Sequence, residues 1–457
     1  MLRSLYLIFV YCAFLGLGAL APFVLSLGYV WVDTFRPQQI AYILLNQFPV
    51  SAFIGALAIG GYLAADRRSP APFGMHAALT LLFAGWITLT TVQFAVAPEA
   101  AWDKWDWAFK TVLFSAFIPL VFRSLVQIEA FIATYVFAAA IHFLPTGLKT
   151  MISGGGYGMG LGVVQGNSGF GEGSTLAAVA LMLIPLVFYL RKHGTLIPRS
   201  PLTDAMFIGL AVVMVACAIG TYARTGLIGL IVLAGAIWLR SDRKILGLIV
   251  GAIAALAITH FTSDDWNERV STINEFQTED SALGRILVWQ WTLGFVSENI
   301  FGGGFHSYQI NEITFPGNAQ FPEGVVTRGK AFHSIYFEVL GEHGWPGIAL
   351  FLGLILTSFL SLQKAARIGR RTPGMEKVKD LAFALQVSLV VMLACGAFIG
   401  VAFQPMLWYI FALSSCTLHY ARRASAAVAS GDAEGAAARQ GRPARTRPAV
   451  ATRLRAQ

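Results

Sequence analysis

The residues of this chain that could carry out chemistry are few and widely spaced. His333 lies in the segment Phe332–Gly347, which closes a long polar loop and leads directly into an apolar run. Arg224 and Arg285 are isolated cations in apolar or acidic surroundings. An imidazole titrates near neutral pH, and a guanidinium binds anionic oxygens through two parallel hydrogen bonds. This combination at the edge of an apolar run indicates chemistry on an anion carried by a lipid.

Composition places these residues in a membrane protein. Of the 457 residues, 56% are hydrophobic and only 12% are charged, whereas a soluble domain has about 25% charged residues. Apolar runs of about 18–25 residues recur and are long enough to cross a bilayer as helices. The sequence therefore predicts an all-α polytopic membrane protein with about twelve transmembrane helices and one large extracytoplasmic loop that contains short helices. The predicted spans are Leu5–Gly28, Ala41–Ala64, Gly74–Ala97, Ala108–Phe122, Gln127–Leu144, Thr175–Leu190, Ala205–Thr221, Thr225–Leu239, Ile245–Phe261, Ile348–Leu362, Leu381–Phe403 and Met406–Tyr420.

Basic residues in short loops decide the predicted orientation, because Lys and Arg mark the cytoplasmic side. The loop Thr262–Trp345 holds four basic residues against eleven acidic ones and is predicted to be external. With both termini inside, four basic clusters fall on the other side: Arg67–Arg68, Arg191–Lys192, Arg240–Lys244 and Lys364–Lys379.

Three further segments complete the predicted organisation. Ala19–Ala21 looks like a signal-peptidase site, but Pro22 would block cleavage, so the first span is predicted to be a retained anchor. The Gly-rich loop Thr146–Ser174 lacks the βαβ surroundings of a nucleotide cradle, and both a re-entrant loop and a plain connection remain open. The tail Ala421–Gln457 is predicted to be disordered and cytoplasmic. Since no folded basic surface with interleaved aromatics is predicted, nucleic-acid binding is not expected.

The external loop contains elements of its own. Ala282–Val296 predicts a helix on the membrane surface, with tryptophans that suit the interface. Gly302–Phe305 predicts a turn. Ala331–Glu342 predicts a second short helix with four side chains on one side: His333, Tyr336, Phe337 and Leu340.

The order of these elements resembles the bacterial O-antigen ligase and polymerase superfamily over roughly Ser174–Tyr420. In chain order, the matching motifs are Thr221–Leu227, Gly284–Trp289, Phe301–Phe305, and His333-Ser334 followed by Gly344, Pro346 and Gly347. The N-terminal spans with the Gly-rich loop resemble the O-glycosylation ligases associated with exosortase systems. Ala223 and Glu172 depart from the family pattern, which more often has Ser before the Arg and an acidic-Asn-Asn run.

This resemblance implies a GT-C-like ligase architecture: an N-terminal transmembrane region (1–173), a ligase- or polymerase-like core (174–420) that includes the loop 262–345, and a tail (421–457). It implies that a glycan moves from an undecaprenyl-diphosphate carrier to a hydroxyl of a glycan, lipid or protein acceptor, outside the bacterial cytoplasmic (inner) membrane. In such a reaction His333 would be the catalytic base, and Arg224 and Arg285 would bind the diphosphate. Further substrate contacts are expected from His306, Lys330, Tyr336 and Glu338.

No cofactor is expected. Metal-dependent glycosyl transfer typically shows an Asp-x-Asp cation site, and the external loops contain no such triplet. The four cysteines all lie in apolar spans, so neither a disulfide framework nor a Cys/His metal site is predicted. The sequence therefore favours a metal-free mechanism.

Each assignment has an alternative. Arg224 could extend to lipid head groups, Arg285 could pair with Glu279 or Asp280, and His333 could be a packed or capping residue. A polysaccharide polymerase of the same superfamily would use the same chemistry on a carrier-linked glycan. A polysaccharide or lipid transporter would also have about twelve spans, but it should show internal repeats and charges at mid-membrane.

Overall fold

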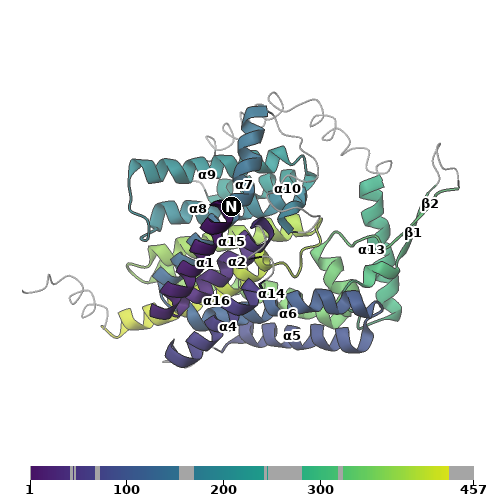
Figure 1. The fold of residues 1–457 in the computed structure, drawn as a ribbon, viewed down its shortest axis with the longest axis horizontal. Coiled ribbons are helices and arrows are strands. Elements are labelled where there is room, and N and C mark those ends of the chain that lie inside the picture. Colours follow the sequence, from purple (N-terminus) through teal and green to yellow (C-terminus); the bar gives the residue numbers. More distant parts are fainter. Residues whose placement is uncertain are drawn as a thin grey trace, which may run out of the picture.

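The computed structural model describes residues 2–41, 45, 48–66, 73–153, 169–240, 244, 280–316 and 323–431. The predicted span Ile245–Phe261, residues 154–168 of the Gly-rich loop and the tail beyond residue 431 lie outside the described residues. The described chain forms a bundle of long helices, with a separate helix and a β-hairpin at one end (Figure 1).

The helices of the N-terminal half are α1 (Leu2–Leu20), α2 (Phe23–Phe35), α3 (Pro37–Ile40), α4 (Val50–Gly61, continued by the π-helical turn Tyr62–Asp66), α5 (Met75–Phe94), α6 (Pro98–Val121) and α7 (Leu125–Ser153). Those that follow are the 3-10 turn Gly169–Gly171, α8 (Gly173–His193), α9 (Pro201–Gly220), α10 (Arg224–Arg240), α13 (Asp280–Glu298), the 3-10 turn Ser307–Ile310, α14 (Ile335–Arg371), α15 (Glu376–Gly396) and α16 (Pro405–Ala429). Among the described residues, seven helices are long and apolar enough to cross a membrane: α1, α5, α7, α8, α9, α14 and α15. The chain is an all-α polytopic membrane protein.

The first predicted span is wrong, because its residues belong to two antiparallel helices. Pro22 separates α1 from α2, since it has no N–H to continue the helical hydrogen bonds. A Cβ added at Gly18 would lie 2.4 Å from Leu25, and one added at Gly28 would lie 2.9 Å from Phe14. Earlier residues of α1 therefore pair with later residues of α2.

This break changes the side on which the chain starts. α1 runs toward Pro22, which lies against Gly61 at the end of α4. The same end of α4 contacts Arg123 through the Tyr62 hydroxyl at 3.5 Å, and the carbonyl of Arg123 accepts from Arg423 late in α16. The start of α1 thus lies opposite the end of α16. The prediction of two termini on one side is wrong for the described ends, because Pro22 hid an additional reversal.

Other predicted spans are found with shifted ends. α6 begins at Pro98 rather than Ala108, and α7 continues through Pro145. α16 continues to Ala429, so the first part of the predicted disordered tail is helical. The predicted span Ile348–Leu362 is the middle of the much longer α14.

Basic side chains gather at one end of the bundle. Lys192 and His193 at the end of α8 both bind Asp380 near the start of α15, at 2.8 Å. The guanidinium of Arg240, at the end of α10, lies 4.0 Å from the ring centre of Phe383. α13 and the β-hairpin lie at the opposite end (Figure 1). This arrangement supports the predicted separation of basic loops from the acidic loop.

α14 packs against α5, α13, α15 and α16 and connects the loop to the bundle. Gly344 kinks it, with φ 65° and ψ −166°. A Cβ at this position would lie 2.1 Å from the carbonyl oxygen of Ile300, so only glycine fits. The N–H of Trp345 donates to that same carbonyl at 3.0 Å. The kink therefore joins the end of α13 to the middle of α14.

The loop also contains a β-hairpin that the sequence interpretation did not predict. β1 (Glu312–Phe315) pairs antiparallel with β2 (Val325–Arg328). Glu312 lies opposite Arg328, and their side chains form an exposed ion pair at 2.6 Å. The strands are rich in β-branched residues, which favour this pleated geometry.

Candidate active site

His333 lies on a backbone segment held between α13 and α15. The indole N–H of Trp289 on α13 donates to the carbonyl of Phe332 at 2.9 Å. The hydroxyl of Tyr336 donates to the carbonyl of Leu393 on α15 at 3.1 Å. Tyr336, which was predicted to contact substrate, therefore uses its hydroxyl to hold α14 to α15.

The helix predicted for Ala331–Glu342 begins only at Ile335. His333 precedes the N-cap residue Ser334 and has a φ of 49°. The predicted helical face shared by His333 and Tyr336 is therefore wrong. Left-handed backbone at a non-glycine residue costs on the order of 1–3 kcal/mol, and such residues often cluster at functional sites. Among the described residues, four non-glycine residues have positive φ: Arg36, Tyr222, His306 and His333.

The surroundings of His333 lower the pKa of its imidazole. Burial is the largest cause, and the guanidinium of Arg285 is the next. Lys330 acts in the same direction, whereas Glu172 and Glu338 oppose it. The ring is therefore neutral at pH 7 and can accept a proton, as a general base must.

Lys330 lies against the start of α13, beside Arg285. A Cβ added at Gly284 would come 2.4 Å from the Cε of Lys330 and 2.8 Å from its Nζ. The side chain of Asn311 accepts from the backbone N–H of Lys330 at 2.9 Å and donates to its carbonyl at 2.7 Å. The ammonium group lies 5.2 Å from the ring centre of Phe315. The β-hairpin thus holds this lysine on the helix that carries Arg285.

Arg224 is the first residue of α10 and follows a tight turn. The hairpin predicted at Thr221–Thr225 is confirmed, and Tyr222 within it has a φ of 51°. The carbonyl of Thr225 accepts from the thiol of Cys395 on α15 at 3.5 Å. This contact fixes the start of α10 to the end of α15.

The same end of α15 also contacts the start of α14. A Cβ added at Gly396 would lie 2.6 Å from the side chain of Ile335. α15 therefore brings the turn of Arg224 to the end of the bundle where His333 lies. The convergence of the Arg224 and Arg285 guanidinium groups on one anion stays a prediction.

Glu172 caps the N-terminus of α8. Its carboxylate accepts from the N–H of Ser174 at 3.0 Å and from both the N–H and the hydroxyl of Thr175 at 2.7 Å. An acidic residue is favoured there by the helix dipole. The sequence interpretation left the role of Glu172 uncertain. The structure assigns it this cap and brings it within electrostatic range of His333.

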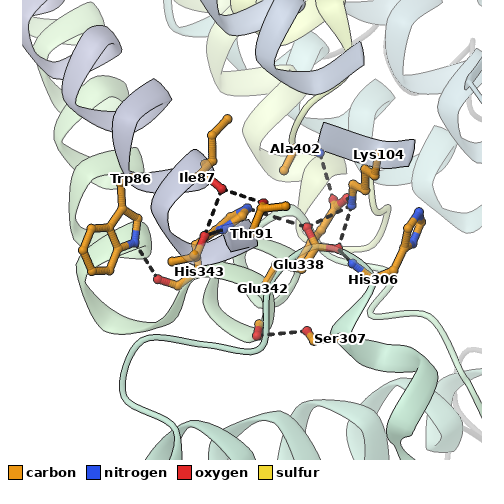
Figure 2. Close-up of polar contacts among 12 residues, drawn as sticks. Trp86, Ile87, Thr91, Lys104, His306, Ser307, Glu338, Glu342, His343 and Ala402 are labelled. Carbon is orange, nitrogen blue, oxygen red and sulfur yellow. Dashed lines mark hydrogen bonds and ion pairs between the residues drawn. The ribbon is translucent and has the colours of Figure 1, made fainter. Parts of the chain in front are cut away.

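A buried ion cluster joins α6 to α14 (Figure 2). The ammonium of Lys104 donates to Glu338 at 2.7 Å and to Glu342 at 2.7 and 2.9 Å, and the three side chains are 6%, 8% and 0% exposed. The second oxygen of Glu338 accepts from the N–H of Ala402, and Glu342 accepts from the N–H of His306, both at 2.9 Å. Both buried carboxylates therefore bind the same ammonium group, and each also accepts from a backbone N–H, since a buried charge must find partners inside the protein.

Sequence reasoning missed Lys104 and proposed Glu338 as a substrate contact. The structure engages both oxygens of Glu338 inside the protein. The available signal was the i, i+4 spacing of Glu338 and Glu342, because two carboxylates on one buried helix face require a cation. α6 provides it, but the predicted span began at Ala108 and left Lys104 outside.

His306 follows the predicted glycine turn Gly302–Phe305, which the structure confirms. The N–H of Gly303 donates to the carbonyl of Gly341 at 3.0 Å, which fixes the turn on α14. Burial, and then the nearby Lys104 ammonium, lower the pKa of His306 to about 4. Its Nδ1 is buried and has no hydrogen-bond partner within the described part of the chain. The predicted contact of His306 with a substrate stays a prediction.

Two stretches of the chain match protein families. Residues 2–195 match a family described as one of unknown function (DUF5935), and residues 209–352 match a family described as O-antigen ligase. The second stretch is similar to O-antigen ligases. No curated protein matches the chain. The O-antigen ligase match covers every predicted site residue and supports, in general terms, a glycosyl-transferring membrane enzyme.

Residues of the N-terminal stretch also contribute to the candidate site of the O-antigen ligase-like stretch. Lys104 and Glu172 both lie within residues 2–195. Lys104 binds both carboxylates of α14, and the carboxylate of Glu172 opposes the lowering of the pKa of His333. The N-terminal stretch is therefore part of the site's construction rather than a separate membrane anchor.

Proposed function

We propose that this protein transfers a glycan from a polyprenyl-diphosphate carrier to an acceptor hydroxyl on the extracytoplasmic face of a bacterial cytoplasmic membrane. The observation that carries the proposal is His333 in left-handed backbone beside α13, with Arg285 and Lys330 in electrostatic range, within a stretch similar to O-antigen ligases. The N-terminal spans further favour the O-glycosylation ligase type associated with exosortase systems.

In this mechanism His333 takes the proton of the acceptor hydroxyl as the hydroxyl oxygen attacks the anomeric carbon of the donor sugar. The bond between that carbon and the diphosphate oxygen breaks, and the diphosphate leaves with the electron pair. Arg224 and Arg285 bind the departing diphosphate through charge-assisted hydrogen bonds. Lys330 adds a third positive charge beside Arg285.

Arginine suits the diphosphate role because its charge persists at every physiological pH and its donors match two phosphate oxygens. These side chains stabilise the charge that develops on the leaving oxygen, so the proposed mechanism requires no metal. His306 follows the glycine turn that is held on α14, and its ring is a further candidate for contact with a sugar hydroxyl.

The test is His333→Ala and His333→Gln in purified protein and in a deletion strain. The glycan-bearing product lost on deletion identifies the reaction, and each variant is then assayed for restoration of that product. A positioned base contributes about 10²–10⁴-fold to rate, so both variants should lose turnover by this factor. His419→Gln is the matched control, because His419 lies in the C-terminal half of α16, and this variant should restore the product.

Donor binding is measured on the same purified variants to separate chemistry from folding. Both His333 variants should bind a polyprenyl-diphosphate-linked glycan as wild type does. Normal turnover per folded molecule in His333→Ala would remove His333 from the mechanism.

A further inference from the structure

α14 carries a row of basic side chains near its C-terminal end, far from the site at His333. They are exposed: Lys364, Arg367, Arg370 and Arg371. None of these side chains forms a hydrogen bond or an ion pair with another described residue. Other exposed cations of the protein bind carboxylates, as in the pairs Lys110–Asp106, Arg191–Asp204 and Arg328–Glu312. The row on α14 is therefore available to an anion from outside the described chain.

The helix dipole accounts for only part of this row. Cations stabilise a helix C-terminus, but the effect is confined to the last turn. Arg370 and Arg371 lie in that turn, whereas Lys364 and Arg367 precede it. Arg367 is three residues from Lys364 and four from Arg371, and like charges at these spacings repel each other. A bound anion would relieve this repulsion.

The basic side chains continue an apolar face of the same helix. Leu352, Leu356 and Leu360 are 47%, 58% and 51% exposed, and in a membrane-spanning bundle this exposure is to lipid. An α-helix turns by about 100° per residue, so these leucines and the four basic side chains lie within about 120° of its circumference. The opposite face is buried and includes Leu354, Ser358, Leu362, Ala365 and Gly369. One lipid-facing side of α14 thus changes from apolar to cationic.

This change falls at the depth where a bilayer core would end. Trp345 begins the part of α14 that follows the kink at Gly344. Lys364 comes nineteen residues later, about 28 Å at 1.5 Å per residue, which is close to the roughly 30 Å of a hydrocarbon core. Tryptophan at one boundary and lysine at the other are typical of membrane interfaces. Arg367 then lies about 4 Å further, at the depth of the lipid head groups.

The C-terminal end of α14 is held against two neighbouring helices. A Cβ added at Gly369 would lie 2.8 Å from the backbone nitrogen of Lys379 at the start of α15. The hydroxyl groups of Thr372, which follows α14, and Ser425 on α16 lie 3.1 Å apart. The helix therefore presents its cations at a fixed spacing, which lowers the entropy cost of binding a ligand.

A phospholipid matches both parts of this face. From Leu352 to Lys364 is about 18 Å, enough for an acyl chain in one leaflet of about 15 Å. Guanidinium and ammonium groups bind phosphate oxygens, and arginine does so with two parallel hydrogen bonds. Four cations without carboxylates favour a head group with net negative charge. Basic residues predict that this end is cytoplasmic, and the cytoplasmic leaflet is rich in anionic lipids. An acidic protein would meet the charges but not the leucines.

We propose that the exposed face of α14 from Leu352 to Arg371 binds an anionic phospholipid of the cytoplasmic leaflet. Lys364 and Arg367 bind its phosphate, and the leucines contact one of its acyl chains. This lipid site goes beyond the proposed transfer function and does not depend on it.

Photolabelling in nanodiscs tests the site without requiring turnover. The probes are phosphatidylglycerol and phosphatidylcholine, each with a diazirine in one acyl chain, at a low fraction in phosphatidylcholine nanodiscs that hold the full-length protein. One Lys or Arg near an anionic lipid strengthens binding about fivefold, so the phosphatidylglycerol probe should label α14 of the wild type at least about fivefold more. High salt should reduce this preference, because ions screen exposed charges.

The double variant Lys364→Gln with Arg367→Gln removes the two cations proposed to bind the phosphate. Its α14 should be labelled equally by the two probes, and unchanged labelling by phosphatidylcholine would show that the helix is still in place. Lys364→Arg with Arg367→Lys keeps both charges and should keep the preference. The matched control is Arg191→Gln with Lys192→Gln, which removes two cations of the same end that bind carboxylates. It should label α14 as the wild type does.

Three outcomes would overturn the proposal. Equal labelling of wild-type α14 by the two probes would indicate only surrounding lipid. A lost preference in the control variant would show that the charge of the whole face, rather than α14, attracts the probe. Binding of soluble polyglutamate that requires Lys364 and Arg367, without any lipid preference, would assign the surface to an acidic protein. Each of these results leaves the proposed transfer function untouched, since glycan transfer is not measured.

Discussion

Two clusters of charged side chains near the start of α14 differ in their surroundings. Lys104, Glu338 and Glu342 are almost fully buried, and every carboxylate oxygen has a partner inside the protein. Around His333, by contrast, Arg285, Lys330 and Glu172 act on the imidazole through their charge, and burial of the ring lowers its pKa. The comparison shows that a closed structural cluster on α14 lies beside the segment that carries His333.

The buried cluster of Lys104, Glu338 and Glu342 fixes the start of α14, next to His333. Glu342 holds the backbone of His306, and Glu338 holds that of Ala402, while both bind α6 through Lys104. Because these contacts come from three separate parts of the chain, the position of α14 is overdetermined. His333, with its left-handed backbone, lies just before this helix, whose position these contacts fix.

The largest expected effect is a loss of stability when the cation of the buried cluster is removed. Lys104→Met leaves two carboxylates buried without their cation, which costs about 3–5 kcal/mol. Thermal unfolding of the purified protein should report it. Lys110→Met, which breaks an exposed pair on the same helix, should change stability by less than about 1 kcal/mol.

A rescue sharpens this prediction. Adding Glu338→Gln and Glu342→Gln to Lys104→Met removes the unpaired charge and keeps the side-chain shapes, so much of the lost stability should return. If Lys104→Met were as stable as wild type, the cluster would not be what holds α14.

The next effect is a loss of activity when the two arginines proposed to bind the diphosphate are replaced. Arg224→Lys and Arg285→Lys keep the charge but lose the bidentate fork, and a charge-assisted hydrogen bond contributes about 1.5–3 kcal/mol. Glycan transfer should fall roughly 10–100-fold in each variant. Arg328→Lys, on the exposed hairpin of the same loop, should retain wild-type transfer.

Coupling between the two arginines tests whether they share one anion. If both bind the same diphosphate, the double variant should lose less than the sum of the single losses in free energy. Fully additive losses would place the two guanidinium groups on separate partners. Near-normal transfer in both single variants would show that neither binds the diphosphate.

A smaller effect is expected in the pH dependence. A base acts only when deprotonated, so kcat/KM should fall with decreasing pH through a midpoint below 6.5, the ordinary pKa of histidine. Lys330→Ala removes a cation that lowers the pKa of His333, so the midpoint should move to higher pH. Glu172→Gln removes an anion that raises it, so the midpoint should move to lower pH. Shifts in the same direction would indicate that another group titrates.

The smallest expected effect is that of chelation. Because Arg224, Arg285 and Lys330 provide the positive charge in the proposed mechanism, excess EDTA should leave glycan transfer unchanged within about twofold. Activity lost on chelation and recovered with Mg²⁺ or Mn²⁺ would show that a metal ion takes part.

The sequence alone determined the features that depend on local composition and spacing. Apolar run lengths predicted an all-α membrane protein, and seven helices in the described part of the chain are long and apolar enough to cross a membrane. The glycine turn at Gly302–Phe305 and the hairpin at Thr221–Thr225 are where they were expected. These succeed because chain reversal and bilayer crossing are decided within a few neighbouring residues. The prediction failed at Pro22, because an apolar run longer than one span contains a break between two helices.

Only the tertiary structure decided which distant residues meet. Lys104 and Glu342 are separated by more than two hundred positions, and no local pattern on α6 identifies its partner. The left-handed backbone at His333 likewise arises from contacts with α13 and α15, although its sequence favoured a helix. The physical reason is common to both: the free energy of a buried charge or a strained residue depends on neighbours that only folding brings into place.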